Sequence, residues 1–298
     1  MTFLNDRKVH LPLADGQIRL LKLKPASSLS DPIECSLFAI SLTKSTRYEA
    51  VSYVWGDQNR YKVIKVNNVD FQIPGNLFEF LPYLRQHGSD RVLWIDGLCI
   101  DQTNNVEKSC QVNMMGDIYK CASHVIIFLG REWDGLDIVI KYLKLAAQQQ
   151  EAHIDPALEP HLHVDGQSIS TPKVARSLTR FFSTDWFFRV WTVQEFVLAK
   201  SFSFQCGSTE LAGDLLLEGF GALRRHVQNT CCGLLSRNKA HGITENLQFF
   251  RSRTKDFVKS SVVRPGLDST NGRSPYPCFM RGPPDDTLAL QCYQRKSN

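Results

Sequence analysis

The sequence has no apolar run of the length that a membrane-spanning helix needs, about 20 predominantly apolar residues. Its first residues, MTFLNDRKVHLPLADG, do not include the apolar core of a secretory signal. Its nine cysteines are an odd number and show no CxxC spacing, which suits a reducing compartment better than a disulfide framework. These absences predict a cytoplasmic protein without a membrane span.

The common signatures of nucleotide-binding and hydrolytic sites are also missing. The chain contains no GxGxxG, no Walker loop, no GxSxG and no HExxH. His161 and His163, and likewise Cys231 and Cys232, have no partners at the spacing of a zinc site. We therefore predict no metal site and no bound cofactor.

Most of the chain has no excess of charge of one sign. The formal net charge is +5, but residues 251–298 hold nine basic and four acidic side chains, so the rest of the chain is neutral. A neutral globular part argues against a nucleic-acid partner. The same end of the chain holds five of the 13 prolines and has no apolar periodicity, which predicts a basic, Pro-rich, disordered tail over 258–298.

Three stretches stand out because each joins an apolar or aromatic run to a carboxylate. They are YEAVSYVWGD at 48–57, LWIDGLCIDQ at 93–102 and FRVWTVQE at 188–195. The run Leu93–Ile95 predicts a strand buried on both faces. The carboxylates that accompany the three stretches are Asp57, Asp96, Asp101 and Glu195.

The pattern around the central stretch predicts an α/β fold with a mostly parallel sheet flanked by helices. A helix is expected after Asn104 or Asn105, with a buried face at every fourth residue: Val106, Cys110, Met114 and Ile118. A second buried strand follows at 124–129, so strand, helix and strand occur within about forty residues, which is typical of a parallel βαβ unit.

Antiparallel strands are expected before this unit, at 17–24 and 33–42, together with a hairpin over 61–73 that turns at Asn67-Asn68. Asn76 is predicted to cap a helix that ends at Gly88. Further helices are predicted over 137–150, 173–182, 185–200 and 214–228, and a short strand over 202–205.

A parallel sheet would collect the acids at its carboxyl edge, where open α/β folds place their ligands. Trp55 and Trp191 would then provide aromatic walls for a nucleobase or nicotinamide ring, with Gln102 beside them. Arg189 could bind a phosphate or form a surface salt bridge. The simpler alternative is that Asp57, Asp96 and Asp101 shape turns and that Glu195 lies on a solvated helix face.

Together, the three stretches and the run QVNMMGDIYKCASHVIIFLG at 111–130 resemble the fungal heterokaryon incompatibility (HET) domain. The resemblance implies a module of self/non-self recognition that triggers programmed cell death. It also implies a HET core at 48–207, preceded by N-terminal strands at 1–47 and followed by a helical extension at 208–257 and the tail at 258–298.

The HET family is thought to be a remote relative of TIR domains, which implies a flavodoxin/TIR-like sheet. WTVQE at 191–195 is similar in spacing to the W-C-x-x-E element of NAD-cleaving TIR domains, with Thr192 in place of the cysteine. The resemblance thus implies NAD as a substrate, with Glu195 as a catalytic residue beside Asp96 and Asp101. The alternative is a non-enzymatic module that works by self-association or by docking a protein partner.

Overall fold

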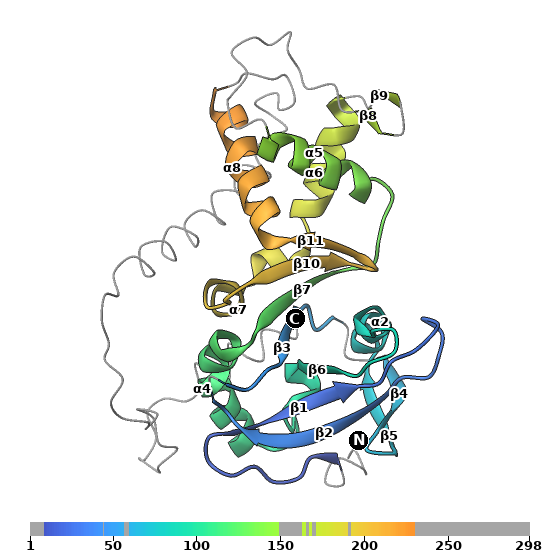
Figure 1. The fold of residues 1–298 in the computed structure, drawn as a ribbon, viewed down its shortest axis with the longest axis vertical. Coiled ribbons are helices and arrows are strands. Elements are labelled where there is room, and N and C mark those ends of the chain that lie inside the picture. Colours follow the sequence, from blue (N-terminus) through green and yellow to red (C-terminus); the bar gives the residue numbers. More distant parts are fainter. Residues whose placement is uncertain are drawn as a thin grey trace, which may run out of the picture. The chain divides into compact units, whose positions relative to one another are not determined.

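The computed structural model describes residues 9–43, 45–56, 60–148, 163–164, 167–168, 171–189 and 192–229 (Figure 1). These residues fall into two compact units. The first contains the chain as far as Phe128 together with Val193–Phe202, and the second contains Leu129–Thr192 and the described residues from Ser203 onward. Residues 230–298 lie outside the described residues, and they include the predicted tail at 258–298.

The first unit is built on a mixed sheet. Its strands are β1 (Gln17–Leu23), β2 (Glu34–Ser41), β3 (Glu49–Tyr53), β4 (Tyr61–Val66), β5 (Val69–Pro74), β6 (Arg91–Trp94) and β7 (His124–Gly130). They lie in the order β7-β3-β6-β1-β2-β4-β5. The β3–β6, β3–β7 and β2–β4 pairs are parallel, and the β1–β2, β1–β6 and β4–β5 pairs are antiparallel. The α/β class and the antiparallel N-terminal strands are confirmed, whereas parallel pairing dominates only around β3.

The predicted βαβ unit consists of β6, helix α4 (Asn105–Cys121) and β7. Both strands run parallel to β3, which lies between them. Residues of all three strands, such as Val51, Trp94 and Ile126, are buried, which explains why these strands are continuous apolar runs. The closer likeness to a flavodoxin or TIR fold stays a prediction.

Helix α4 begins as expected but buries a different face. The Asn104 side chain accepts hydrogen bonds from the amides of Val106 and Glu107, so the predicted cap is confirmed. Val106, however, is 76% exposed, and Cys110 and Met114 are only half-buried, so of the predicted four-residue stripe only Ile118 is buried. The buried residues are Gln111, Val112, Met115, Ile118 and Tyr119, a stripe of mixed three- and four-residue spacing that follows the 3.6-residue turn.

The hairpin and the helix after it are confirmed with one correction. Asn67 and Asn68 have φ angles of 51° and 64°, the left-handed conformation that a two-residue hairpin turn requires. Helix α2 (Gly75–Leu84) begins two residues earlier than predicted and ends before Gly88. Asn76 therefore lies inside the first turn rather than at the cap, and its amide donates to the Val54 carbonyl.

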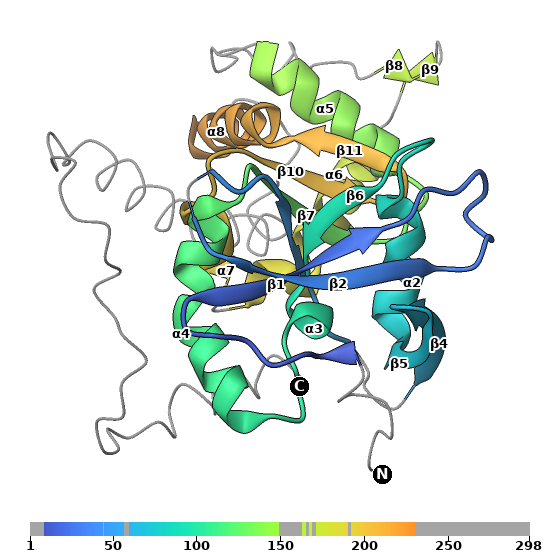
Figure 2. The same ribbon diagram turned by 60° about the horizontal axis from the view of Figure 1, so that its bottom comes forward.

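The remaining helices of the first unit are short. Helix α3 (Asp96–Cys99) follows β6 directly, and helix α7 (Thr192–Val197) contains Glu195. The single helix predicted over 185–200 is wrong, because a separate 3₁₀ helix, η2 (Asp185–Phe188), precedes α7. Helix α3 lies against β1 (Figure 2).

The second unit packs helices around an aromatic cluster. Its elements are α5 (Leu136–Gln148), β8 (His163–Val164), β9 (Gln167–Ser168), α6 (Thr171–Phe182), η2, β10 (Phe202–Cys206), β11 (Thr209–Ala212) and α8 (Gly213–Asn229). The β10–β11 hairpin is antiparallel, and β11 was not predicted. The cluster consists of Phe181, Phe182, Trp186, Phe187 and Phe204, all buried. Within the residues described, no helix is both long and apolar enough to cross a membrane.

Candidate functional site

Two of the predicted carboxylates are hydrogen-bonded to residues at the end of β3. The Ser52 hydroxyl donates to Glu195 Oε2 at 2.5 Å. The Trp55 indole N–H lies 3.2 and 3.1 Å from the two carboxylate oxygens of Asp96. Glu195 is 0% exposed and Asp96 is 1% exposed. One short segment, 52–55, thus connects the first sequence stretch to both of the others.

The parallel pairing of β3 and β6 places Asp96 at this edge. Ala50 is in register with Trp94, so the residues that follow both strands emerge on the same side of the sheet. Asp96 is the first residue of α3, and its Oδ1 also accepts the Gly97 amide at 2.8 Å. These donors satisfy a carboxylate whose burial would otherwise be costly.

Gly97 is required beside Asp96 because of a close approach. A Cβ at position 97 would lie 2.4 Å from the Tyr53 hydroxyl oxygen and 3.0 Å from Leu77 Cδ1. Tyr53 is the last residue of β3 and Leu77 belongs to α2. The glycine therefore permits α3 to pack against both elements and keeps the Asp96 carboxylate within reach of Trp55.

Glu195 comes from α7, far along the chain, and its burial contradicts the solvated-face alternative. Its partner Ser52 is itself buried on β3. The sequence analysis did not identify Ser52. The signal was the single serine inside the apolar run Ala50–Val54, because a small polar side chain in a strand buried on both faces needs a partner.

Trp55 is held in place rather than standing open. It is 8% exposed, and the preceding carbonyl, that of Val54, accepts a hydrogen bond from the Asn76 amide. The next residue, Gly56, has a φ of 67° and packs against the Asn76 side chain. The indole is thus oriented toward Asp96. That the Trp55 ring stacks on a ligand stays a prediction.

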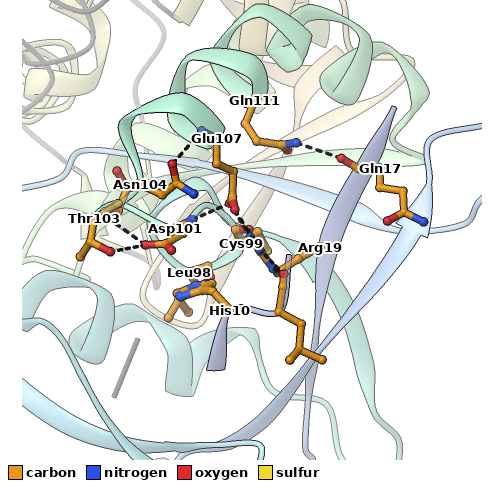
Figure 3. Close-up of polar contacts among 12 residues, drawn as sticks. His10, Gln17, Arg19, Leu98, Cys99, Asp101, Thr103, Asn104, Glu107 and Gln111 are labelled. Carbon is orange, nitrogen blue, oxygen red and sulfur yellow. Dashed lines mark hydrogen bonds and ion pairs between the residues drawn. The ribbon is translucent and has the colours of Figure 1, made fainter. Parts of the chain in front are cut away.

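Asp101, seen in Figure 3, and its neighbour Gln102 shape the connection between α3 and α4. Asp101 Oδ1 accepts hydrogen bonds from the Thr103 amide at 3.0 Å and the Thr103 hydroxyl at 2.6 Å. The Asp101 amide donates to Glu107 Oε1 at 2.8 Å, and Gln102 Nε2 donates to the Asp96 carbonyl at 3.0 Å. These contacts are those of the turn that was considered as the alternative for Asp101.

A buried ion pair between Arg19 on β1 and Glu107 on α4 anchors the same connection (Figure 3). The two guanidinium nitrogens lie 2.5 and 2.9 Å from the two carboxylate oxygens. Arg19 also donates to the carbonyls of Leu11 and Cys99. It is 2% exposed. A bidentate pair of this kind has both strength and a defined orientation.

Sequence reasoning missed this pair because it treated 17–24 as a half-buried strand. Residues Ile18–Leu21 are all buried, Arg19 among them. Both faces of β1 are therefore covered, and a buried guanidinium requires an acidic partner. The partner, Glu107, is the third residue of α4. Nothing in the sequence near Arg19 indicates this partner.

Three predicted site residues do not belong to the described part of the first unit. Arg189 belongs to the second unit, where it follows η2 and its amide donates to the Trp186 carbonyl at 3.3 Å. Asp57 and Trp191 lie outside the described residues. The structure thus brings Asp96 and Glu195 to one edge through Ser52 and Trp55, and turns Asp101 toward α4.

The chemistry available at this edge is that of buried hydrogen bonds. Among the described residues, no group of three or more His, Cys, Asp or Glu side chains is arranged to hold a metal ion.

Burial raises the pKa of the Cys35, Cys99 and Cys206 thiols to about 12. These three cysteines are thus protonated at neutral pH, whereas the thiolate is the reactive form of cysteine.

Comparison with known proteins gives two matches. Residues 48–195 match the family model described as heterokaryon incompatibility protein (HET). The chain is also 34% identical over 224 residues to heterokaryon incompatibility protein 6, OR allele, of Neurospora crassa. That match covers 64% of this chain and 33% of the relative, so the chain spans about a third of the length of the curated relative. No solved structure matches.

Proposed function

We propose that this chain is a fungal self/non-self recognition module of the heterokaryon incompatibility (HET) type that triggers programmed cell death. The match of residues 48–195 to the family model supports the recognition part. The incompatibility function that the name of the Neurospora relative gives supports it independently. The cell-death output, the cytoplasmic location and the identity of the partner belong to the same proposal.

One observation supports a non-enzymatic route to this output. Asp96 and Glu195, the two acids at the sheet edge, are both buried and hydrogen-bonded to other parts of the same unit. Their contacts join the three sequence stretches into one core. This arrangement suits a rigid platform whose outer surface binds a protein partner or a second copy of the chain, and so we propose that the module signals by association.

The experiment for this proposal is inducible expression of the full chain in a filamentous fungus, with cell death scored by uptake of a vital dye. We expect death to follow induction, or fusion with a strain that supplies the partner. A matched control is Val106→Lys, because Val106 is exposed and has no part in the core. Unchanged viability at confirmed protein levels, in induced and fused cells alike, would contradict the proposal.

A second candidate is cleavage of NAD, and the Ser52–Glu195 contact favours it. This contact places a carboxylate and a hydroxyl beside the carboxyl end of a parallel strand, where α/β folds bind ligands. In this route water adds to the ribosyl carbon as nicotinamide leaves, and Glu195 stabilises the positive charge that develops there. Trp55 would stack on the leaving ring.

The two routes are separated by incubating the purified full chain with NAD and measuring free nicotinamide by chromatography. The association route predicts no release above that of a heat-denatured sample. Release that disappears in Glu195→Gln, at unchanged thermal stability, would establish the enzymatic route and overturn the first one. Release that persists in Glu195→Gln would exclude Glu195 as the catalytic residue.

A further inference from the structure

The outer edge of β2 is covered by another strand only at its beginning (Figure 1). Along its inner edge β2 pairs with β1 over its whole length. On the outer edge β4 pairs with Glu34 and Cys35 alone. The Asn67 side chain then accepts the Leu37 amide at 3.0 Å, which ends the contact with the β4–β5 turn. Among the described residues, no strand lies beside the rest of this edge.

The backbone groups of this edge can be assigned from the register. The Lys24 amide donates to the Glu34 carbonyl, so even-numbered residues of β2 bond to β1. The odd-numbered residues then face outward, which agrees with the Asn67 amide donating to the Cys35 carbonyl. The outward groups beyond the Asn67 contact are the Leu37 carbonyl and the amides and carbonyls of Ala39 and Ser41.

The side chains of this segment lack the features that usually protect an edge strand. Residues 36–42, SLFAISL, contain no charged residue and no proline. Natural edge strands are commonly protected by lysines, prolines or bulges. Phe38 is 36% exposed and Ala39 is also exposed. An uncharged, partly apolar edge with outward-facing amides is suited to pairing with another strand.

We propose that this edge pairs with the same edge of a second copy of the chain, antiparallel and about a two-fold axis at Ala39. The segment is self-complementary, because a neutral segment meets a neutral segment and no like charges oppose each other. Ala39 meets its own copy at the axis, where a small side chain is required. Phe38 lies opposite Ile40 of the second copy, an aromatic–β-branched pair.

This register is consistent with the backbone as well. Phe38 and Ile40 direct their own amides toward β1, so they form the non-hydrogen-bonded pairs, in which side chains approach most closely. The Leu37 amide is already occupied by Asn67. The two copies therefore gain the two backbone hydrogen bonds between their Ala39 residues. The interface is isologous and closes as a dimer.

The test uses the purified full chain in analytical ultracentrifugation over a concentration series. Wild type is expected to show a monomer–dimer equilibrium. Ala39→Pro removes the outward amide without removing a bond to β1, and Ala39→Asp keeps the amide but sets two like charges opposite each other. Either variant should weaken dimerisation by about tenfold or more, which corresponds to about 1.4 kcal/mol. Val106→Asp, the same charge on the exposed face of α4, should leave it unchanged.

A crosslink tests the register. Cβ atoms of a hydrogen-bonded antiparallel pair lie about 5.5 Å apart, within the span of a short bifunctional thiol reagent. Ala39→Cys should therefore link two copies above the level of wild type when such a reagent is added, and Val106→Cys should not. A wild type that is monomeric at every concentration overturns the proposal, and so does dimerisation that survives in both Ala39→Pro and Ala39→Asp. Capture of an unrelated extended peptide by a monomeric chain also overturns it.

The inference rests on the association route of the proposed function, but the two fail separately. Dimerisation is measured on purified protein, and cell death is measured in the fungus. A dimer that causes no death would leave this inference standing and remove the proposed function. Death caused by a monomeric wild type would do the reverse.

Discussion

Ser52 on β3 donates a 2.5 Å hydrogen bond to Glu195, a residue 143 positions later in the chain. Both side chains are buried. The contact connects the first and third sequence stretches, and Trp55 connects the first and second through Asp96. The three stretches are therefore parts of one packed core, and changes at these residues should affect folding before they affect any surface.

We expect Ser52→Ala to destabilise the protein by about 1–3 kcal/mol, because it removes a hydroxyl donor from a buried carboxylate. Urea denaturation followed by circular dichroism measures the change. Ser28→Ala is the control, since Ser28 lies in an exposed loop. A loss of stability no larger than that of the control would show that the Ser52 contact is not formed in solution.

Breaking the Arg19–Glu107 pair should be more costly. Glu107→Leu leaves a buried guanidinium without its carboxylate, and such changes cost about 3–5 kcal/mol. Arg19→Met with Glu107→Leu removes both charges and should recover a large part of this loss. Chemical denaturation of both single variants and the double variant gives the coupling energy. If the two single effects simply add, the residues do not interact.

Sequence reasoning succeeded where the signal was local. The turn at Asn67-Asn68, the Asn104 cap and the apolar runs of β3, β6 and β7 each depend on neighbouring residues only. It failed where the deciding contact was distant. Val106 has the spacing of a core residue but is 76% exposed, and Asn76 bonds to the Val54 carbonyl instead of capping its helix.

The candidate site follows the same division. That the chain places acids at the carboxyl edge of parallel strands could be predicted for Asp96, which directly follows its strand. The partners could not be predicted, because Ser52 and Arg19 find Glu195 and Glu107 through tertiary contacts more than eighty residues away in sequence. Asp101 was predicted as part of the site, and the structure shows its side chain in a turn before α4, bonded to Thr103.

The buried thiols give a prediction about pH. Burial raises the pKa of Cys35 and Cys99 from 9.0 to about 12, so the folded state favours the protonated form. Their contribution to stability is complete below about pH 9 and is lost as the pH rises toward about 12, because the unfolded chain ionises first. Denaturation midpoints measured between pH 7 and the alkaline limit should fall only in that window. In native protein at pH 8, peptide mapping should find both residues unalkylated by iodoacetamide.

Gly97 and Gly116 form a matched pair of glycines for substitution. A Cβ at Gly97 would lie 2.4 Å from the Tyr53 hydroxyl, whereas the nearest atom to a Cβ at Gly116 is Leu198 Cδ1 at 3.4 Å. Gly97→Ala should cost about 1–3 kcal/mol through overpacking. Gly116→Ala lies within α4 and should be neutral or stabilising by up to about 1 kcal/mol. Thermal denaturation measures both, and Tyr53→Phe should partly rescue Gly97→Ala.

The last prediction concerns Glu195→Gln, for which the two proposed routes give opposite results. The amide oxygen of glutamine can still accept the Ser52 hydrogen bond, so the fold is expected to survive with a loss of about 1 kcal/mol or less. In the association route the carboxylate charge has no chemical task, and cell death should be retained at matched protein levels. In the enzymatic route the charge stabilises a developing cation, and a neutral amide cannot replace it.

Loss of toxicity at unchanged melting temperature, together with loss of nicotinamide release, would therefore reject the association route. Retained toxicity in this variant, with cell death reduced in Ser52→Ala only in proportion to its folded fraction, would instead assign Glu195 to the core of the platform.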